Sequence, residues 1–276
     1  MAYKRILTIQ DISCVGQCSL TVALPILSAC GLETSILPSA VLSTHTAGFT
    51  GYTFRDLTGD MPAIKDHWKK EQLQFEAIYT GYLGSREQIS YIREMFRELK
   101  TASGVTVVDP AMADNGKLYP GFDGAYVEAM VALCADADFV VPNITEACFL
   151  TGMEFKTQYD RSYIDGLLAA LAEKGMSNVV LTGVSYAEGR TGVVVYEKGV
   201  YSYYEHELLP NSCHGTGDIY ASALVGAMMR GKTAVQAAKI AADYTVDCIK
   251  ETAKLDNHWY GAAFEPVLYK LHEYLK

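Results

Sequence analysis

The chain of 276 residues lacks the features of a membrane protein or a nucleic-acid-binding protein. No segment approaches the roughly 20 consecutive apolar residues that a membrane-spanning helix needs. No run of basic residues occurs and the formal net charge is −9, so we expect neither nucleic acid nor an anionic membrane as a partner. An acidic protein can still bind phosphate locally, through backbone N–H groups and a metal ion.

Cysteine pairs and targeting segments are also missing. The seven cysteines are scattered without a Cys-x-x-Cys pair, which argues against a zinc ribbon or a thioredoxin-like site and favours apolar filler in a reducing compartment. Near the N-terminus only Ile6–Ile9 is apolar before Gln10 and Asp11, which is typical of a buried strand rather than a signal peptide. We therefore expect a cytoplasmic protein.

What the sequence does have is an alternation of short apolar runs with amphipathic stretches. Arg86–Lys100 and Tyr163–Lys174 carry apolar residues at spacings of three and four, which predicts helices. The alternation predicts an α/β fold, with a mostly parallel sheet covered by helices on both faces. No repeat or linker interrupts it, so we expect one domain over residues 1–276. The candidate strands are Ile6–Ile9, Thr34–Leu37, Ala77–Thr80, Val105–Val108, Phe139–Val141, Val179–Leu181, Val193–Tyr196 and Tyr201–Tyr204.

Polar residues or glycines follow five of these strands, where an open α/β sheet binds its ligands. The five pairs are Gln10-Asp11, Gly81-Tyr82, Asp109-Pro110, Pro142-Asn143 and Thr182-Gly183. Any one strand must end in something polar, but five together predict a cleft. The turn-rich stretch Met112–Gly124 is longer than a typical loop between a strand and a helix, so it is either a lid over this cleft or a plain surface excursion.

The most informative segment is the glycine-rich turn Asn211–Asp218, which opens into a mostly apolar, hence buried, helix that should end at Gly231. Glycines on both sides of Thr216 let successive N–H groups point at one spot, at the positive end of the helix dipole. Asp218 could accept a proton from an alcohol while those N–H groups hold a phosphoryl group. The alternative is that Asp218 merely caps the helix.

A second candidate site is the segment Pro142–Glu146. Glu146 can hold Mg²⁺, usually through water, or Asn143 and Glu146 can form a capping box, and both interpretations can hold together. Asp109 is a further carboxylate at the same predicted edge. Neither a Walker A string nor the HRD and DFG strings of protein kinases occurs, so a phosphotransferase with this sequence belongs to neither group.

Over nearly its whole length the chain resembles the ribokinase superfamily, and within it the pyridoxal kinases. The segments that carry the resemblance are Thr8–Gln10, Ser43–Thr46, Thr80–Ser85, Asp109–Asp114, Pro142–Glu146 and Gly215–Asp218. The last two mark the superfamily, whereas His45-Thr46 and Gly81–Gly84 indicate the vitamin B6 branch. The resemblance implies a ribokinase-like three-layer α/β/α fold, a homodimer, and the use of ATP and Mg²⁺, and it leaves open a monovalent cation such as K⁺.

The resemblance also implies roles for individual residues. Asp218 would deprotonate the 5′-hydroxymethyl group of pyridoxal, pyridoxine or pyridoxamine, and the backbone of Gly215, Thr216 and Gly217 would form the anion hole. The implied substrate-binding residues are Asp11, His45, Thr46 and Tyr82, of which Tyr82 would stack on the pyridine ring. The implied nucleotide-binding residues are Asp109, Asn143, Glu146, Thr182, Lys117 and Tyr119, of which Glu146 and Asp109 would also serve the metal.

Two alternatives and one departure accompany this interpretation. A hydroxymethylpyrimidine kinase would share the fold and chemistry, and a non-catalytic vitamin B6-binding homologue would share the pocket but need no base such as Asp218. Many members carry serine where this chain has Asp11, and an ionised aspartate can only accept hydrogen bonds. The ranking of substrates therefore stays open. His45 could equally be a hydrogen-bonded structural residue.

Overall fold

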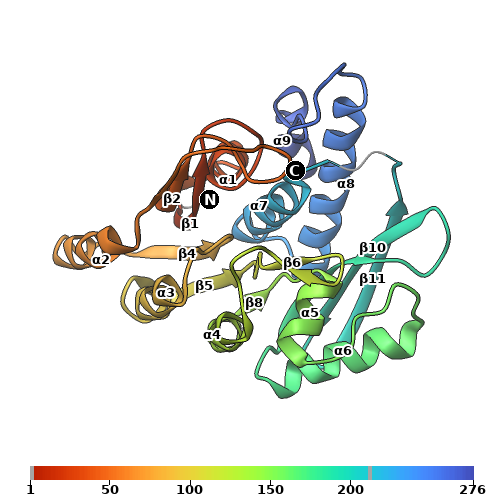
Figure 1. Ribbon diagram of the computed structural model, residues 1–276, viewed down its shortest axis with the longest axis horizontal. Helices are drawn as coiled ribbons and strands as arrows, with labels where there is room; N and C mark the ends of the chain where they lie inside the picture. Colours follow the sequence, from red (N-terminus) through yellow and green to blue (C-terminus); the bar gives the residue numbers. More distant parts are fainter. Residues whose placement is uncertain (1–2, 211–212) are drawn as a thin grey trace.

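The computed structural model describes residues 3–210 and 213–276, which contain a central sheet of nine strands (Figure 1). The strands of this sheet are β1 (Arg5–Ser13), β2 (Glu33–Leu42), β3 (Phe54–Asp56), β4 (Phe75–Thr80), β5 (Lys100–Val108), β8 (Phe139–Val140), β9 (Asn178–Val184), β10 (Arg190–Glu197) and β11 (Val200–Glu207). Their order is β11-β10-β9-β8-β5-β4-β1-β2-β3. The pairs from β2 across to β9 are parallel, whereas β3, β10 and β11 pair antiparallel with their neighbours. The mostly parallel sheet is thus confirmed.

Helices cover both faces of the sheet. They are α1 (Leu20–Ala29), α2 (Met61–Lys70), α3 (Arg86–Glu98), α4 (Gly124–Ala135), α5 (Ile144–Thr151), α6 (Arg161–Glu173), α7 (Thr216–Met229), α8 (Ala234–Thr252) and α9 (Lys270–Tyr274). Figure 1 shows α3 to α6 on one side of the sheet and α1, α7 and α8 on the other. The three-layer α/β/α architecture expected from the alternating pattern is therefore present. None of the described helices is long and apolar enough to cross a bilayer.

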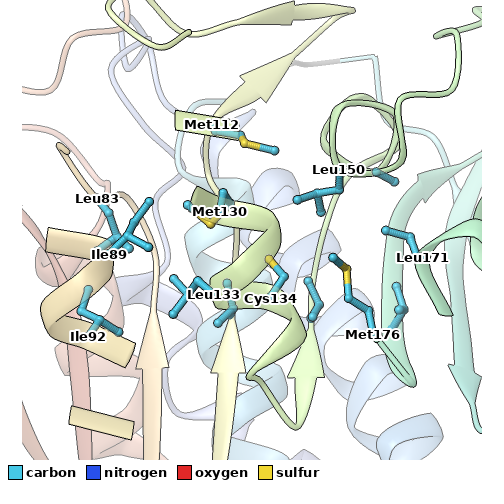
Figure 2. Close-up of a cluster of buried hydrophobic side chains, with 14 of the residues drawn as sticks. Leu83, Ile89, Ile92, Met112, Met130, Leu133, Cys134, Leu150, Leu171 and Met176 are labelled. Atoms are coloured by element: carbon cyan, nitrogen blue, oxygen red, sulfur yellow. The ribbon is translucent and has the colours of Figure 1, made fainter. Parts of the chain in front are cut away.

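Each face of the sheet has its own hydrophobic core, because successive side chains of a strand point to opposite faces. In β1, Ile6 packs with α1 and α7, whereas Leu7 and Ile9 pack with α3 and its neighbours. Figure 2 shows part of the core that contains Leu7 and Ile9, where Cys134 of α4 lies among apolar side chains. All seven cysteines are free, four of them buried, which agrees with their expected role as apolar filler.

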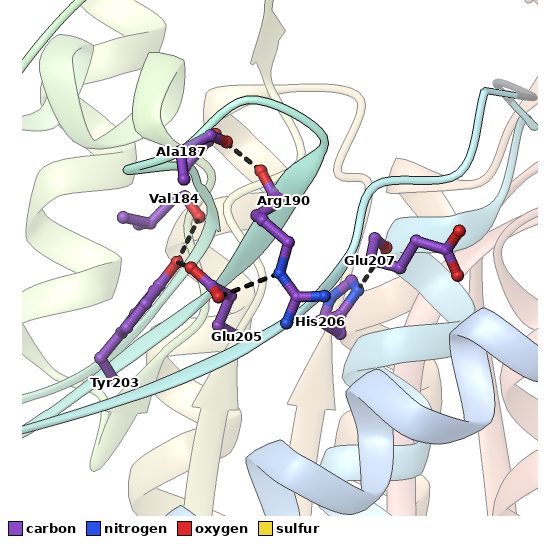
Figure 3. Close-up of polar contacts among 8 residues, drawn as sticks. Val184, Ala187, Arg190, Tyr203, Glu205, His206 and Glu207 are labelled. Carbon is purple, nitrogen blue, oxygen red and sulfur yellow. Dashed lines mark hydrogen bonds and ion pairs between the residues drawn. The ribbon is translucent and has the colours of Figure 1, made fainter.

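The antiparallel edge of the sheet is held by polar contacts as well as by its ladder (Figure 3). The Arg190 Nε donates to Glu205 Oε1 over 2.9 Å, and the Tyr203 hydroxyl donates to the Val184 carbonyl over 3.4 Å. The ion pair is about two-fifths exposed, so we expect it to add little stability.

The eight predicted strands are all present, but several predicted ends are wrong. Gln10-Asp11 lies inside β1, because pairing with β2 continues to Ser13, and Thr182-Gly183 lies inside β9, because pairing with β10 continues to Val184. Lys100 begins β5 instead of ending the preceding helix, and Val141 lies just beyond β8. The stretch Met112–Gly124 is not a plain loop, since it contains the hairpin of β6 (Ala113–Asp114) and β7 (Lys117–Leu118).

Candidate active site

The glycine turn before α7 lies against the chain that leads into α1. Gly215 has φ +77°, and a Cβ there would collide with the carbonyl oxygen of Gln17, so only glycine fits. By contrast, no atom lies within 4 Å of where a Cβ of Gly217 would be, which leaves room above the helix start. The helix begins at Thr216, inside the predicted turn, and Gly231 follows its end with φ +91°, as predicted. Asn211 and Ser212 of the predicted turn lie outside the described residues.

Asp218 stands in the first turn of α7, where the N–H groups have no partner within the helix. Its Oδ2 accepts a hydrogen bond from the Ser19 N–H over 2.9 Å. Burial raises the pKa of Asp218 to about 7, the charges of Asp109 and Asp11 add to the rise, and the Ser19 bond opposes it. A carboxylate with a pKa near neutrality suits a general base.

Asp109, which is half-buried, and Glu146, which is buried, form a pair of carboxyl groups beyond β5 and at the start of α5. Burial raises the pKa of Asp109 to about 6, and burial together with Asp109 raises the pKa of Glu146 well above its usual value. Glu146 Oε2 accepts from Asn143 N over 2.8 Å and its Oε1 accepts from Met112 N over 3.1 Å. Asn143 Oδ1 in turn accepts from Glu146 N over 2.9 Å, so the predicted capping box is confirmed.

Asp109 and Glu146 suit Mg²⁺, which needs few protein ligands, better than a metal ion whose ligands all come from protein side chains. Burial is the main reason why both pKa values rise, and no ion pair with a cationic side chain is found for either group among the described residues. No group of three or more His, Cys, Asp or Glu side chains able to hold a metal occurs in the described part of the chain. Mg²⁺ usually takes one or two carboxylates and completes its shell with waters and substrate phosphates.

The hairpin β6–β7 is docked onto the start of α5. The Asn143 side-chain amide donates to the Ala113 carbonyl over 2.9 Å, and the Gly116 N–H donates to Thr145 Oγ1 over 3.1 Å. Tyr119 follows the hairpin, and its pKa is raised by burial of the hydroxyl and by the charges of nearby carboxylates. The hairpin therefore brings Tyr119 close to the carboxyl groups.

The remaining nucleotide candidates differ in their connection to this region. Thr182 pairs with Asn143 across an isolated bridge, and its N–H donates to the Pro142 carbonyl over 2.9 Å, so it joins the cluster. Lys117 is exposed at the hairpin. No hydrogen bond or ion pair links Lys117 to the described site residues, so its role stays a prediction.

The ring of His45, one of the predicted substrate residues, lies 5.5 Å from that of His214, which directly precedes Gly215. His45 is 4% exposed, and its Nε2 pairs with the Tyr260 carbonyl over 2.7 Å while its Nδ1 accepts from the Ala47 N–H over 3.1 Å. These bonds give His45 a structural task in addition to any contact with substrate. Thr46 beside it is exposed.

Tyr82 belongs to a stack of aromatic rings. Its ring lies 5.6 Å from that of Phe122, which in turn stacks on Tyr126 at 3.8 Å. Burial raises the pKa of Tyr82 to about 12, and the charge of Asp11 adds to the rise. Tyr82 and Asp11 therefore lie in one region, and the Tyr82 hydroxyl stays protonated at neutral pH.

Sequence reasoning missed two parts of the site. Ser19 binds Asp218 through its backbone, and no sequence pattern marks that contact. The C-terminal segment also reaches the glycine turn, because Ala262 N donates to the His214 carbonyl over 3.1 Å and Gly261 pairs with Gln17. Gly261 was the available signal, since a Cβ there would collide with Gln17.

Known proteins share both this sequence and this fold. Residues 63–263 match the family model described as phosphomethylpyrimidine kinase. Pyridoxal kinase PdxY of Granulibacter bethesdensis is 27% identical over 263 residues, covering 91% of this chain and 90% of the relative. The crystal structure of pyridoxal kinase from Lactobacillus plantarum superposes with a TM-score of 0.92 at 31% identity, covering 99% of this chain and 98% of that one.

A further crystal structure, assigned to a phosphomethylpyrimidine kinase of Bacteroides thetaiotaomicron in a form with pyridoxal, has a TM-score of 0.91 at 34% identity. It covers 99% of this chain, and this chain covers 96% of it. Matches of this extent include the glycine turn, Asp218 and the Asn143–Glu146 segment. The chain therefore belongs to the phosphomethylpyrimidine kinase family, and it groups with the pyridoxal kinases of the ribokinase-like superfamily.

Proposed function

We propose that the protein transfers the γ-phosphoryl group of ATP to the 5′-hydroxymethyl group of a vitamin B6 compound, with Asp218 as the base. The observation that carries this proposal is the position of Asp218, a carboxylate of pKa about 7 in the first turn of a helix that opens from a glycine turn. Membership of a kinase family and the likeness to a structure with pyridoxal support the choice of reaction and substrate.

In the proposed reaction Asp218 takes the proton of the substrate hydroxyl as its oxygen attacks the γ-phosphorus. The bond from that phosphorus to the β-bridging oxygen breaks, giving a phosphate ester and ADP. The backbone N–H groups of Gly215, Thr216 and Gly217 hold the transferring phosphoryl group, since they point from the positive end of α7. The proton then leaves Asp218 for solvent.

Bound Mg²⁺ would neutralise charge on the phosphates. We propose that Asp109 and Glu146 hold this ion and that Glu146 acts through water, because both of its oxygens already accept backbone N–H bonds. Asn143, Thr182, Lys117 and Tyr119 remain the proposed nucleotide-binding residues, and His45, Thr46 and Tyr82 the proposed substrate-binding ones. The ring stack beside Tyr82 suits a flat heterocycle.

We also propose that the protein works as a homodimer, as the family resemblance implies. We place it in the cytoplasm, because its seven free cysteines suit a reducing compartment. Sedimentation at several concentrations tests the dimer, and a single monomeric species would contradict it. Replacing K⁺ by a large organic cation in the assay tests the monovalent-ion requirement.

The direct test is ADP formation by the purified protein with pyridoxal, pyridoxine, pyridoxamine and hydroxymethylpyrimidine in turn. We expect turnover with the three vitamers, and Asp218→Asn should lower it by about 10²–10⁴-fold while nucleotide binding persists. Asp160→Asn, at the exposed N-cap of α6, is the matched control. Turnover with hydroxymethylpyrimidine alone would favour the pyrimidine kinase, and binding without ADP would favour a non-catalytic homologue.

A further inference from the structure

Ser19, the residue that binds the proposed base, has an unusual backbone conformation. Its φ is +55° and its ψ is −131°, a combination that residues other than glycine rarely adopt. This conformation aims the Ser19 N–H at Asp218 Oδ2 over 2.9 Å. A strained residue at such a place persists only if its surroundings hold it.

A hydrogen bond of the Ser19 hydroxyl holds the Ser19 backbone in this conformation. Ser19 stands at the N-cap of α1, where a serine side chain usually accepts a bond from the first turn of the helix, but here it makes no such bond. Instead the Ser19 Oγ donates to Asp11 Oδ1 over 2.6 Å. This bond crosses from the start of α1 to β1, so it ties the strained residue to the central sheet.

Both carboxylate oxygens of Asp11 accept a hydrogen bond from a serine hydroxyl. Its Oδ2 accepts from the Ser13 hydroxyl over 3.0 Å, and the three side chains are all buried, Asp11 being 5% exposed. Burial raises the pKa of Asp11, and the hydrogen bonds from the Ser19 and Ser13 hydroxyls oppose that rise. Asp11 is therefore equipped to hold Ser19, whereas contact with a substrate would have to compete with these two serine hydroxyls.

From this geometry we infer that Asp11 is a positioning residue, which holds the Ser19 backbone in its strained conformation so that the Ser19 N–H orients Asp218. The inference rests on the proposed role of Asp218 as base. In this inference Asp11 positions Ser19 and does not select the substrate directly. It also explains why an aspartate and a serine occur together at these positions, since each satisfies the other inside the protein.

The test uses glycine, which adopts positive φ without a restraint. Asp11→Ala removes the acceptor, and we expect kcat to fall by about 100-fold, because a small misplacement of a catalytic group costs that much. KM for ATP and for the vitamers should change far less. Adding Ser19→Gly to Asp11→Ala should then restore kcat at least about tenfold, since the backbone no longer needs the restraint.

A second pair of variants keeps the test decisive if Asp11→Ala does not fold. Ser19→Ala and Ser19→Gly both remove the hydroxyl, but only glycine tolerates the backbone conformation, so Ser19→Gly should turn over about tenfold faster than Ser19→Ala. Ser13→Ala is the internal control, because it removes an equally buried bond to Asp11 without touching Ser19. It should cost less kcat than Ser19→Ala.

Two outcomes would overturn the inference. One is failure of Ser19→Gly to exceed Ser19→Ala or to rescue Asp11→Ala. The other is a loss in Asp11→Ala that appears in the vitamer KM or in the ranking of pyridoxal, pyridoxine and pyridoxamine, which would make Asp11 a substrate-binding residue. Failure of the proposed function is distinguishable, because the unaltered chain would then bind vitamers without forming ADP or would turn over hydroxymethylpyrimidine alone. Failure of the proposed base would appear as undiminished turnover of Asp218→Asn.

Discussion

The ionised side chain of Asp218 should lower the free energy of unfolding of the protein. Burial raises its pKa from 3.8 to about 7, so the folded protein holds this proton over a range of pH in which the unfolded chain has released it. The stabilising contribution of the protonated group is complete below pH 3.8 and is lost as pH rises towards 7. The amide that Asp218→Asn introduces has no proton to lose, so this variant should become more stable relative to the natural chain as pH rises.

The rise in pKa of Asp218 corresponds to about 4 kcal/mol of lost stability once the carboxyl is fully ionised. Between pH 5 and pH 8 the difference in free energy of unfolding between Asp218→Asn and the natural chain should grow by about 3 kcal/mol in favour of the variant. Urea denaturation of both proteins at the two pH values, followed by circular dichroism, measures this change. The same variant should have lost its turnover, which would separate stability from catalysis.

Asp160→Asn provides the control for this experiment. Asp160 caps α6, and hydrogen bonds from Ser162 and Tyr163 lower its pKa, so the folded chain does not retain its proton as pH rises in the way that Asp218 does. Its variant should differ from the natural chain by the same amount at pH 5 and pH 8. A difference for Asp218→Asn that is equally independent of pH would refute the claim that burial raises the pKa of this carboxyl.

Three further substitutions test separate parts of the site. Gly16→Ala places a Cβ against the His45 ring at φ +105°, so it should raise the vitamer KM and cost about 1–3 kcal/mol of stability, and an unchanged KM would leave His45 without a part in binding. Glu146→Gln should raise the Mg²⁺ concentration for half-maximal activity by about 10–100-fold, and an unshifted Mg²⁺ titration would remove this residue from the metal site. Asn143→Ala should lose about 1 kcal/mol of unfolding free energy through the lost cap, measured in urea, and no loss would mean that the capping box contributes nothing.

The sequence predicts the existence of the strands better than their ends. Ile6–Ile9 and Ala77–Thr80 are recognisable because buried parallel strands are continuous apolar runs. Asp11 can continue β1 because a distant partner, the hydroxyl of Ser19, donates to its carboxylate, and the side-chain amide of Gln10 donates to Thr8 of the same strand. Periodicity contains no information on such partners, so the predicted strand stopped too early.

In the candidate site too, the sequence predicts some features and not others. The turn at Gly215 and the capping box of Asn143 are local, so short patterns predict them. The contact of Ser19 with Asp218 joins residues 199 positions apart and depends on a positive φ in a residue other than glycine. Neither the separation nor the strain leaves a mark in the residue types, and only the folded chain reveals them.

The bridge between Gln17 and Gly261 has a consequence for the order in which the protein is made. The ribosome produces the approach to α1 first, whereas residues 257–263, which brace the turn at His214, follow α8 in the chain and are synthesised after it. A nascent chain that ends soon after α8 would contain the base and the glycines without their brace. We expect the ability to phosphorylate to arise only when residues 257–263 have docked, so that a chain ending directly after α8 would not consume ATP.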